Sequence, residues 1–163
     1  PYDPILHAHI TSGGHGTMGY DLPSSIGAAM ACPEKTILCV VGDGSLLMNI
    51  QELASLCDRQ LNVKILVLNN SRLGIVSQFQ LITWGDDPTT GDFVSPNFSA
   101  IAQGFGISSA RVDSMDGLRE QVDWFWKRAG PVLLEVMIDS DSDVTPMLLA
   151  GQNMGEMWKG RDL

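Results

Sequence analysis

Long hydrophobic runs are missing from this sequence. The longest apolar stretches among its 163 residues have the length of a β-strand, so no segment could span a membrane, and no secretory signal is visible. Internal repeats and low-complexity tracts are also absent. We therefore expect one ordinary domain with no membrane partner.

Basic residues and cysteines are scarce. Lys and Arg number 10 against 19 Asp and Glu, and the net charge of −9 argues against a nucleic-acid partner, because nucleic acids bind basic surfaces. Cys32, Cys39 and Cys57 are odd in number and lie in or beside apolar segments. Such cysteines are typical of buried free thiols in a reducing compartment, so we expect a cytoplasmic location.

What the sequence does contain is typical of a globular domain. Apolar residues make up 44% and charged residues 18%, and the chain is long enough to bury a core. Strand-like runs alternate with segments of helical periodicity, which predicts an α/β fold, a doubly wound parallel sheet with helices on both faces. The expected strands are 36–41, 63–68, 107–112 and 131–138, and the expected helices are 46–58, 98–104, one beginning near Pro23 and one carrying Met115, Leu118, Val122 and Phe125.

Three segments of the single domain 1–163 are expected to be irregular. Residues 1–20 form a Gly- and His-rich N-terminal loop, and 139–163 form a C-terminal tail. Residues 71–96 contain turn chemistry, and an irregular connection of that length is usually functional or mobile. We therefore expect 71–96 to be an active-site loop.

Two short motifs follow the first two predicted strands. They are Gly42-Asp43-Gly44-Ser45 and Asn69-Asn70, and about 27 residues separate Asp43 from Asn70, the length of one strand–helix–strand unit. The strands of such a unit run parallel. Both motifs therefore reach the carboxyl edge of the sheet, where open α/β sheets bind ligands.

The chemistry of these motifs suits a metal ion that carries a diphosphate. A carboxylate, an amide oxygen and a nearby backbone carbonyl make a hard, all-oxygen site for Mg²⁺. Gly42 and Gly44 let the backbone approach phosphate oxygens, and the helix that follows directs its positive N-terminus towards them. The plainer interpretation makes Asp43 a helix cap and Asn70 a turn residue.

The two motifs together resemble the signature of thiamine diphosphate enzymes, which opens with Gly-Asp-Gly and ends in Asn-Asn. The similarity extends over 11–147 to the acetolactate synthase branch of the pyruvate-oxidase-like group. The segments that carry it are Thr11–Ala29, Met48–Ala54, Asn69–Val76 and Gly130–Val136.

This resemblance implies the cofactors thiamine diphosphate and Mg²⁺. It makes Asp43, Asn70 and the backbone carbonyl of Arg72 the metal ligands. Ser45 is also compatible with an ordinary helix N-cap, which does not exclude phosphate contact. The implied diphosphate contacts are Gly42, Gly44, Ser45, Gly74 and Ile75.

A second implied group of residues is Gly16-Thr17-Met18. In relatives the position matching Met18 holds the cofactor in a bent shape, and the backbone at Gly16 and Met18 hydrogen-bonds its aminopyrimidine ring. The cofactor then removes its own proton, so the protein supplies posture and electrostatics. A methionine in an apolar run is otherwise a core residue.

Two positions depart from acetolactate synthases. His15 stands where those enzymes usually carry Leu. It is either a catalytic acid or base near the cofactor, a contact for a polar substrate, or an exposed loop histidine. Phe79 stands where they typically carry a Trp that lines the acceptor pocket. The preference for the second substrate is therefore open.

The resemblance also implies partners. The family's essential glutamate lies on the pyrimidine-binding domain of a neighbouring subunit, and no residue here matches it; we interpret Glu52 as a solvated or interface residue. We expect a homo-oligomer, a pyrimidine-binding domain or subunit that supplies the glutamate, and a small 2-oxoacid substrate. The first strand and helix of the cofactor domain are expected before Pro1, and the isolated chain is expected to be inactive.

The leading hypothesis is the diphosphate- and Mg-binding module of an enzyme most like acetolactate synthase, which decarboxylates pyruvate and transfers the hydroxyethyl unit to a 2-oxoacid. Another decarboxylase, acetyltransferase or lyase of the family stays open, as does a non-catalytic partner subunit. The acidic stretch 139–143 does not predict a calcium loop, because Val144 and Ala150 stand where an EF-hand needs Gly and Glu.

Overall fold

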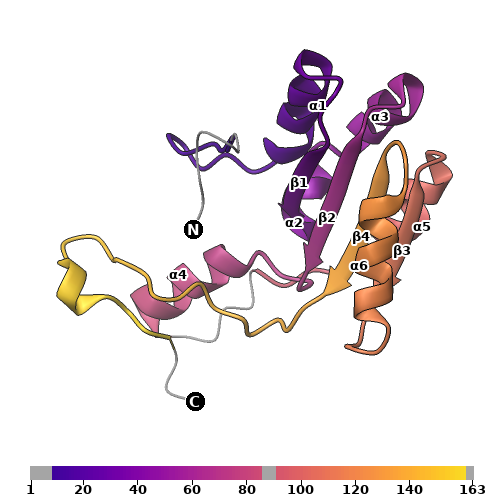
Figure 1. Ribbon diagram of the computed structural model, residues 1–163. Helices are drawn as coiled ribbons and strands as arrows, with labels where there is room; N and C mark the ends of the chain where they lie inside the picture. The colour runs from indigo at the N-terminus through magenta and orange to yellow at the C-terminus, as the bar shows by residue number, and fades with distance from the viewer. Residues whose placement is uncertain (1–8, 86–90, 161–163) are drawn as a thin grey trace.

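A parallel β-sheet forms the centre of the molecule. The computed structural model describes residues 9–85 and 91–160. In these ranges the strands follow the order β1-β2-β4-β3, and each neighbouring pair is parallel (Figure 1). The strands are β1 (Ile37–Gly42), β2 (Val63–Asn69), β3 (Ser108–Val112) and β4 (Val132–Met137). All four predicted strands are confirmed within two residues at each end.

Helices connect the strands. Pro23 lies in the first turn of the first helix, as predicted, and the helix expected at 98–104 is confirmed at those bounds. None of the helices in the described ranges is long and apolar enough to cross a membrane. The helices are α1 (Asp21–Ala31), α2 (Asp43–Met48), α3 (Leu53–Arg59), α4 (Gly74–Trp84), α5 (Phe98–Gly104) and α6 (Leu118–Lys127), with short 3-10 turns η1 (Ile50–Glu52) and η2 (Met154–Glu156).

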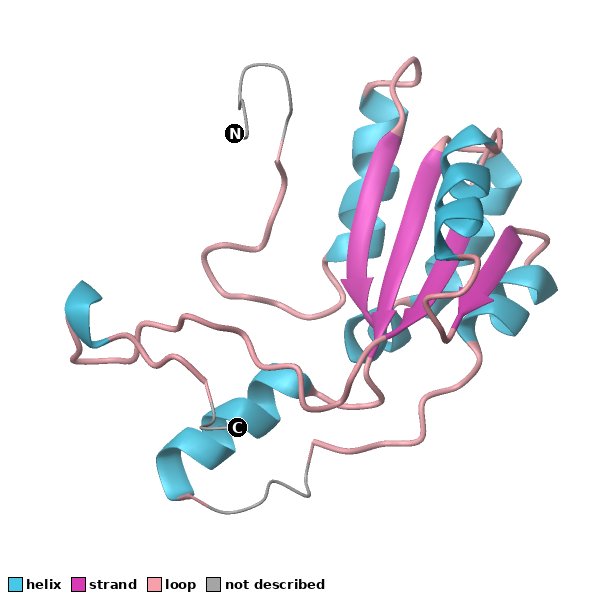
Figure 2. Ribbon diagram, turned by 60° about the horizontal axis from the view of Figure 1, so that its bottom comes forward, coloured by secondary structure: helices cyan, strands magenta, loops and turns pink. Residues whose placement is uncertain are grey.

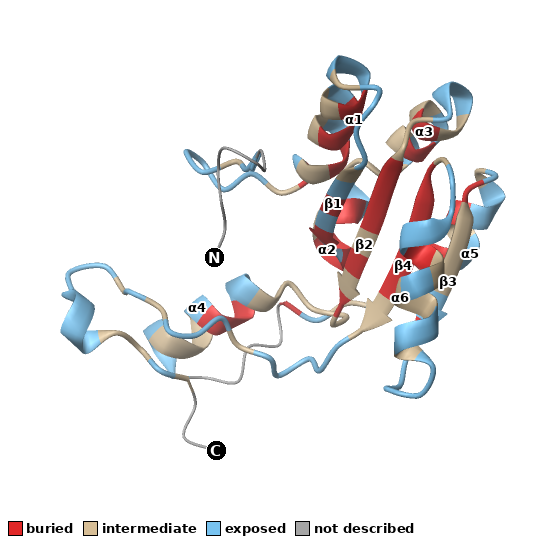
Figure 3. Cartoon of the chain, in the orientation of Figure 1, coloured by how far each residue is buried: buried red, intermediate tan, exposed pale blue. Residues whose placement is uncertain are grey.

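The sheet has helices on both faces, which confirms the predicted fold class (Figure 2). On one face, α1, α3 and α5 pack against alternate strand residues such as Ile65 and Leu133. On the other face, Phe125 of α6 packs against Val132 and Leu134. The central strands β2 and β4 are consequently the most deeply buried part of the molecule (Figure 3).

The second face is covered only in part. Helix α6 lies over β3 and β4, and no described helix covers β1 on that side (Figure 1). Leu38 and Val40 of β1 are 44% and 49% exposed, whereas Cys39 and Val41 between and beyond them are buried against the α1 side. Apolar side chains of β1 therefore remain at the surface.

Two predictions of local structure were wrong. The helix expected at 46–58 is interrupted at Asn49, which has non-helical dihedral angles and whose side chain donates to the carbonyl oxygen of Gly19 at 2.6 Å. The segment 71–96 is not irregular throughout, because it contains α4. Helix α4 buries the polar Ser77 and Gln78 and leaves Phe79 exposed, so its burial pattern does not follow hydrophobicity.

Candidate functional site

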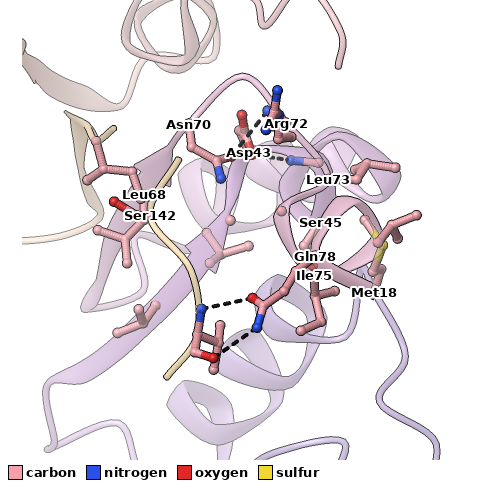
Figure 4. Close-up of a pocket in the computed structure, with 18 residues that line it drawn as sticks. Met18, Asp43, Ser45, Leu68, Asn70, Arg72, Leu73, Ile75, Gln78 and Ser142 are labelled. Carbon is pink, nitrogen blue, oxygen red and sulfur yellow. Dashed lines mark hydrogen bonds between the residues drawn. The ribbon is translucent and has the colours of Figure 1, made fainter. Parts of the chain in front are cut away.

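The carboxyl ends of β1 and β2 open into a cavity of about 330 Å³. Since β1 and β2 are adjacent and parallel, the motifs that follow them reach the same edge of the sheet, as predicted. Figure 4 shows Asp43, Asn70 and Arg72 together at one end of this cavity, with Met18 and Ile75 further along it. The cavity is lined by nine of the predicted site residues: Met18, Gly42, Asp43, Gly44, Ser45, Asn70, Arg72, Gly74 and Ile75.

Asp43 is the first residue of α2 and is buried, with 2% of its surface exposed. One carboxylate oxygen accepts from the Gly44 N–H at 2.9 Å and the other from the Ser71 N–H at 2.8 Å. Burial raises the pKa of Asp43, and these backbone donors oppose the rise. No described Lys, Arg or His forms an ion pair with it. A desolvated carboxylate without a cation partner is the expected state of a metal ligand.

Asn70 follows β2 directly and is half-buried. Its amide oxygen accepts from the Arg72 N–H at 3.1 Å, which closes a tight turn over Ser71. Ser71 adopts the left-handed conformation with φ of +54°, which is uncommon for a residue other than glycine. The chain therefore reverses sharply after Asn70 and returns into α4 beside Asp43.

The donor chemistry fits the implied metal ion and diphosphate. The cavity presents a carboxylate and an amide oxygen, which are hard ligands suited to Mg²⁺. It also presents a closely packed backbone at Gly44, since a Cβ atom there would lie 2.3 Å from Leu73 Cδ2 and 3.4 Å from Met18 Cε. A side chain at Gly44 would require Leu73 to move, and Met18 lies close to the same position.

Ser45 connects the N-terminal loop to α2. Its hydroxyl donates to Asp21 at 2.7 Å and accepts from the Gly19 N–H at 2.8 Å. The hydroxyl hydrogen is thus already used inside the protein. The backbone of Ser45 remains the group that a phosphate could contact.

Four other residues considered in the sequence analysis lie outside the cavity lining. His15 and Gly16 are exposed, and Gly16 has φ of +62° and donates its N–H to the Ser12 carbonyl oxygen at 2.7 Å. Phe79 is on α4 and 49% exposed. Glu52 is in η1 and accepts from the Ser55 hydroxyl at 3.1 Å.

Several lining residues were not anticipated. Gln78 lines the cavity and exchanges two hydrogen bonds with the backbone of Val144, both at 2.9 Å (Figure 4). From the sequence, only the backbone carbonyl of Arg72 was expected to take part. The Arg72 guanidinium pairs with Asp92 at 2.5 Å and with Asp141 at 3.4 Å. These contacts join segments up to 69 positions apart, so no local pattern in the sequence predicts them.

A parallel α/β sheet with a carboxylate, an amide and glycines at its carboxyl edge belongs to the class of folds that bind their ligands at that edge. Residues 3–136 match the model of the family described as thiamine pyrophosphate enzyme, C-terminal TPP binding domain. The chain belongs to this family. The resemblance to thiamine diphosphate enzymes that the sequence motifs indicate is confirmed.

Related proteins agree with this assignment. The chain is 41% identical to the acetolactate synthase isozyme 1 large subunit of Escherichia coli, with 91% of this chain and 26% of the relative covered. It is 39% identical to the mitochondrial acetolactate synthase catalytic subunit of Saccharomyces cerevisiae, with 92% and 22% covered. The chain therefore spans about a quarter of the length of these relatives.

A solved structure is also similar. The thiamine diphosphate-dependent 4-hydroxybenzoylformate decarboxylase of Rhodococcus jostii RHA1 superposes with a TM-score of 0.71 at 27% sequence identity. The match covers 77% of this chain and 24% of that one. The chain is thus the thiamine pyrophosphate-binding C-terminal domain of an acetolactate synthase-like protein.

Proposed function

We propose that this domain binds thiamine diphosphate through Mg²⁺ and serves an enzyme that makes acetolactate from pyruvate. The observation that supports this most is the position of Asp43 and Asn70, which follow adjacent parallel strands and line one cavity. When bound, the cofactor supplies the electron sink for decarboxylation of a 2-oxoacid.

The residues of the domain have distinct roles in this proposal. Asp43, Asn70 and the Arg72 carbonyl hold the metal ion, and the backbone from Gly42 to Ser45 and at Gly74 and Ile75 binds the diphosphate. Met18 contacts the rings of the cofactor and fixes its posture. The N-terminus of α2 adds a favourable positive potential for the phosphate groups.

The proposal includes a partner. The exposed Ile75 and Val76 line the cavity on α4, and Phe79 and Trp84 of the same helix are also exposed. Such an apolar rim is suited to contact with another protein surface. We propose that a pyrimidine-binding domain covers it, supplies the missing glutamate, and belongs to a second subunit of a homo-oligomer.

Calorimetric titration with thiamine diphosphate and Mg²⁺ tests the site. The Asp43→Ala variant loses a charged metal ligand. Residues that only orient metal ligands change metal affinity by about 10- to 100-fold, so we expect the loss of a ligand itself to lower the affinity by a factor of about 100 or more. Asp58→Ala removes an exposed carboxylate on α3 and is the matched control. An unchanged affinity in Asp43→Ala would refute the metal assignment.

A second candidate function is simple decarboxylation of an aromatic or aliphatic 2-oxoacid. It is favoured by Phe79, which replaces a Trp of acetolactate synthases, and by the structural likeness to a 4-hydroxybenzoylformate decarboxylase. Product analysis separates the two functions. Incubation of the assembled enzyme with pyruvate should give acetolactate, whereas the alternative predicts the free aldehyde of the 2-oxoacid supplied, which is acetaldehyde for pyruvate.

A further inference from the structure

We infer that Asn69 and Glu135 are positioning residues that hold the metal-binding turn in place. The proposed function gives Asn70, the second asparagine of its pair, a direct role at the metal and leaves Asn69 without one. Yet Asn69 is 1% exposed and Glu135 is 0% exposed. Buried polar side chains of this kind are retained only where they are hydrogen-bonded.

Glu135 provides the fixed end of the arrangement. It lies in the middle of β4, and one carboxylate oxygen accepts from the Ser99 N–H in the first turn of α5 at 3.1 Å. The other oxygen accepts from Asn69 Nδ2 at 2.7 Å and from Arg111 at 3.5 Å. Every partner is a donor, so Glu135 acts purely as an acceptor and joins two strands to a helix.

Asn69 transmits this constraint to the turn. Its amide oxygen accepts from the Ser71 N–H at 3.0 Å and lies 3.4 Å from the Ser71 hydroxyl. The same Ser71 N–H also donates to Asp43 at 2.8 Å. One asparagine side chain thus connects the core carboxylate to the backbone group that holds the proposed metal ligand Asp43.

The arrangement has a defined polarity. The Asn69 amide donates to Glu135 and accepts from the Ser71 N–H, and it can do both in only one orientation. Ser71 occupies a left-handed conformation, which costs free energy and persists only where the surrounding structure enforces it. Asn69 therefore fixes the direction of Asn70 and of the Arg72 carbonyl.

This positioning role rests on the proposed function. The test is calorimetric titration of the full chain with Mg²⁺ at a saturating concentration of thiamine diphosphate. Residues that orient metal ligands typically change metal affinity by about 10- to 100-fold, and we expect a loss of that size for Asn69→Ala. Asn62→Ala is the matched control, because Asn62 stands just before β2 and its side chain donates to the exposed Thr36 hydroxyl at 2.8 Å, away from the metal-binding turn. Asn69→Ala introduces no charge, so it gives a measurement even if a charged variant does not fold.

A reversed pair separates positioning from general stability. Asn69→Asp places two carboxylates together and should weaken binding at least as much as Asn69→Ala. Adding Glu135→Gln restores the hydrogen bond in the opposite direction, with the amide now at position 135 donating to the carboxylate at position 69. The double variant should therefore bind Mg²⁺ about tenfold more tightly than Asn69→Asp alone. In the absence of metal, the Ser71 amide should exchange its hydrogen faster in Asn69→Ala than in Asn62→Ala.

The possible failures are distinguishable. If the wild-type chain itself does not bind Mg²⁺ with thiamine diphosphate, the proposed function is wrong and this inference falls with it. If the wild type binds and Asn69→Ala binds as tightly as Asn62→Ala, only the positioning role is refuted. A double variant no better than Asn69→Asp also refutes it.

Discussion

Gly44 is the residue at which the site has least room for a side chain. A methyl group there would lie 2.3 Å from Leu73 Cδ2, which must move aside. We expect Gly44→Ala to lower the free energy of unfolding by about 1–3 kcal/mol, the usual cost of overpacking, and to weaken cofactor binding. Urea unfolding and calorimetry measure the two effects.

Gly27→Ala is the control for this change. Gly27 is in the middle of α1, and beyond its chain neighbours and the backbone of its own helix no atom lies within 4 Å of the added methyl group, so alanine should be neutral or stabilising there. The double variant Gly44→Ala with Leu73→Ala should recover cofactor affinity relative to Gly44→Ala. Equal stability of the two glycine variants would contradict the close contact with Leu73.

Cys39 makes the stability depend on pH. Burial raises the pKa of its thiol from 9.0 to about 11. The folded state therefore favours the neutral thiol, and stability is fully present below pH 9.0 and is lost as the pH rises towards 11. We expect a loss of about 1.4 kcal/mol at pH 10, from one unit of pH above the unfolded pKa.

The measurement is urea unfolding at pH 8 and pH 10. Other groups also titrate in this range, so the quantity of interest is the difference between the wild type and Cys39→Ala. Cys32→Ala keeps the buried thiol and should follow the wild type. An identical pH dependence in wild type and Cys39→Ala would show that the thiol does not contribute.

Lys64 of β2 stabilises the C-terminal end of helix α6. It is 1% exposed, and its ammonium group donates to the carbonyl oxygens of Arg128, the C-cap of α6, and Gly130, the latter at 3.1 Å. Desolvation lowers the pKa of Lys64, yet a positive charge at a helix C-terminus is favourable. We expect Lys64→Met to cost about 1–3 kcal/mol, because two carbonyls lose their donor.

Lys127→Met is the control for Lys64→Met. Lys127 lies on α6, the helix whose end Lys64 contacts, and its ion pair with Asp123 at 3.9 Å is exposed. Exposed pairs of this kind contribute about 0–1 kcal/mol. Thermal unfolding of the two variants should therefore separate them clearly, and similar melting temperatures would show that the carbonyls find water instead.

Helix α4 was not predicted from the sequence, and its burial pattern is the reason. Hydrophobic periodicity assumes that apolar residues face the core, but this helix buries Ser77 and Gln78 and exposes Ile75 and Phe79. Gln78 faces inward because it bonds the backbone of the C-terminal segment. A signal was present in Gly85, whose φ of +71° is typical of the residue that ends a helix.

At the scale of the whole molecule, the convergence of Asp43 and Asn70 could be predicted, and the support around it could not. The convergence depends only on two parallel strands and one connecting unit, which are visible in the sequence. The contact of Asn69 with Glu135 depends on β4 lying beside β2, which the strand order alone decides. Similarly, nothing near Arg72 in the sequence indicates Asp141.

The exposed side chains of β1 lead to a prediction about association. Among the described residues, β1 pairs only with β2, and Leu38 stands exposed on its uncovered face. A free strand edge beside apolar surface promotes self-association. We expect the 163-residue chain to form dimers or larger species at micromolar concentration, and Leu38→Glu to reduce them.

Light scattering after size-exclusion chromatography measures the effect. Val94→Glu introduces the same charge at a residue that is 97% exposed and lies outside β1, so it should leave association unchanged. Equal molar masses for wild type and Leu38→Glu would mean that β1 is not the contact surface.

The spacing of the site along the chain also has a consequence for folding. The contact between Asp43 and Ser71 closes a loop of 28 positions, whereas that between Asn69 and Glu135 closes one of 66. The longer closure costs about 0.8 kcal/mol more entropy, a small difference, but its partner also leaves the ribosome much later. All three proposed metal ligands are therefore synthesised before the strand that holds their turn rigid. During translation, the ligands can meet first, and the arrival of β4 then fixes their geometry.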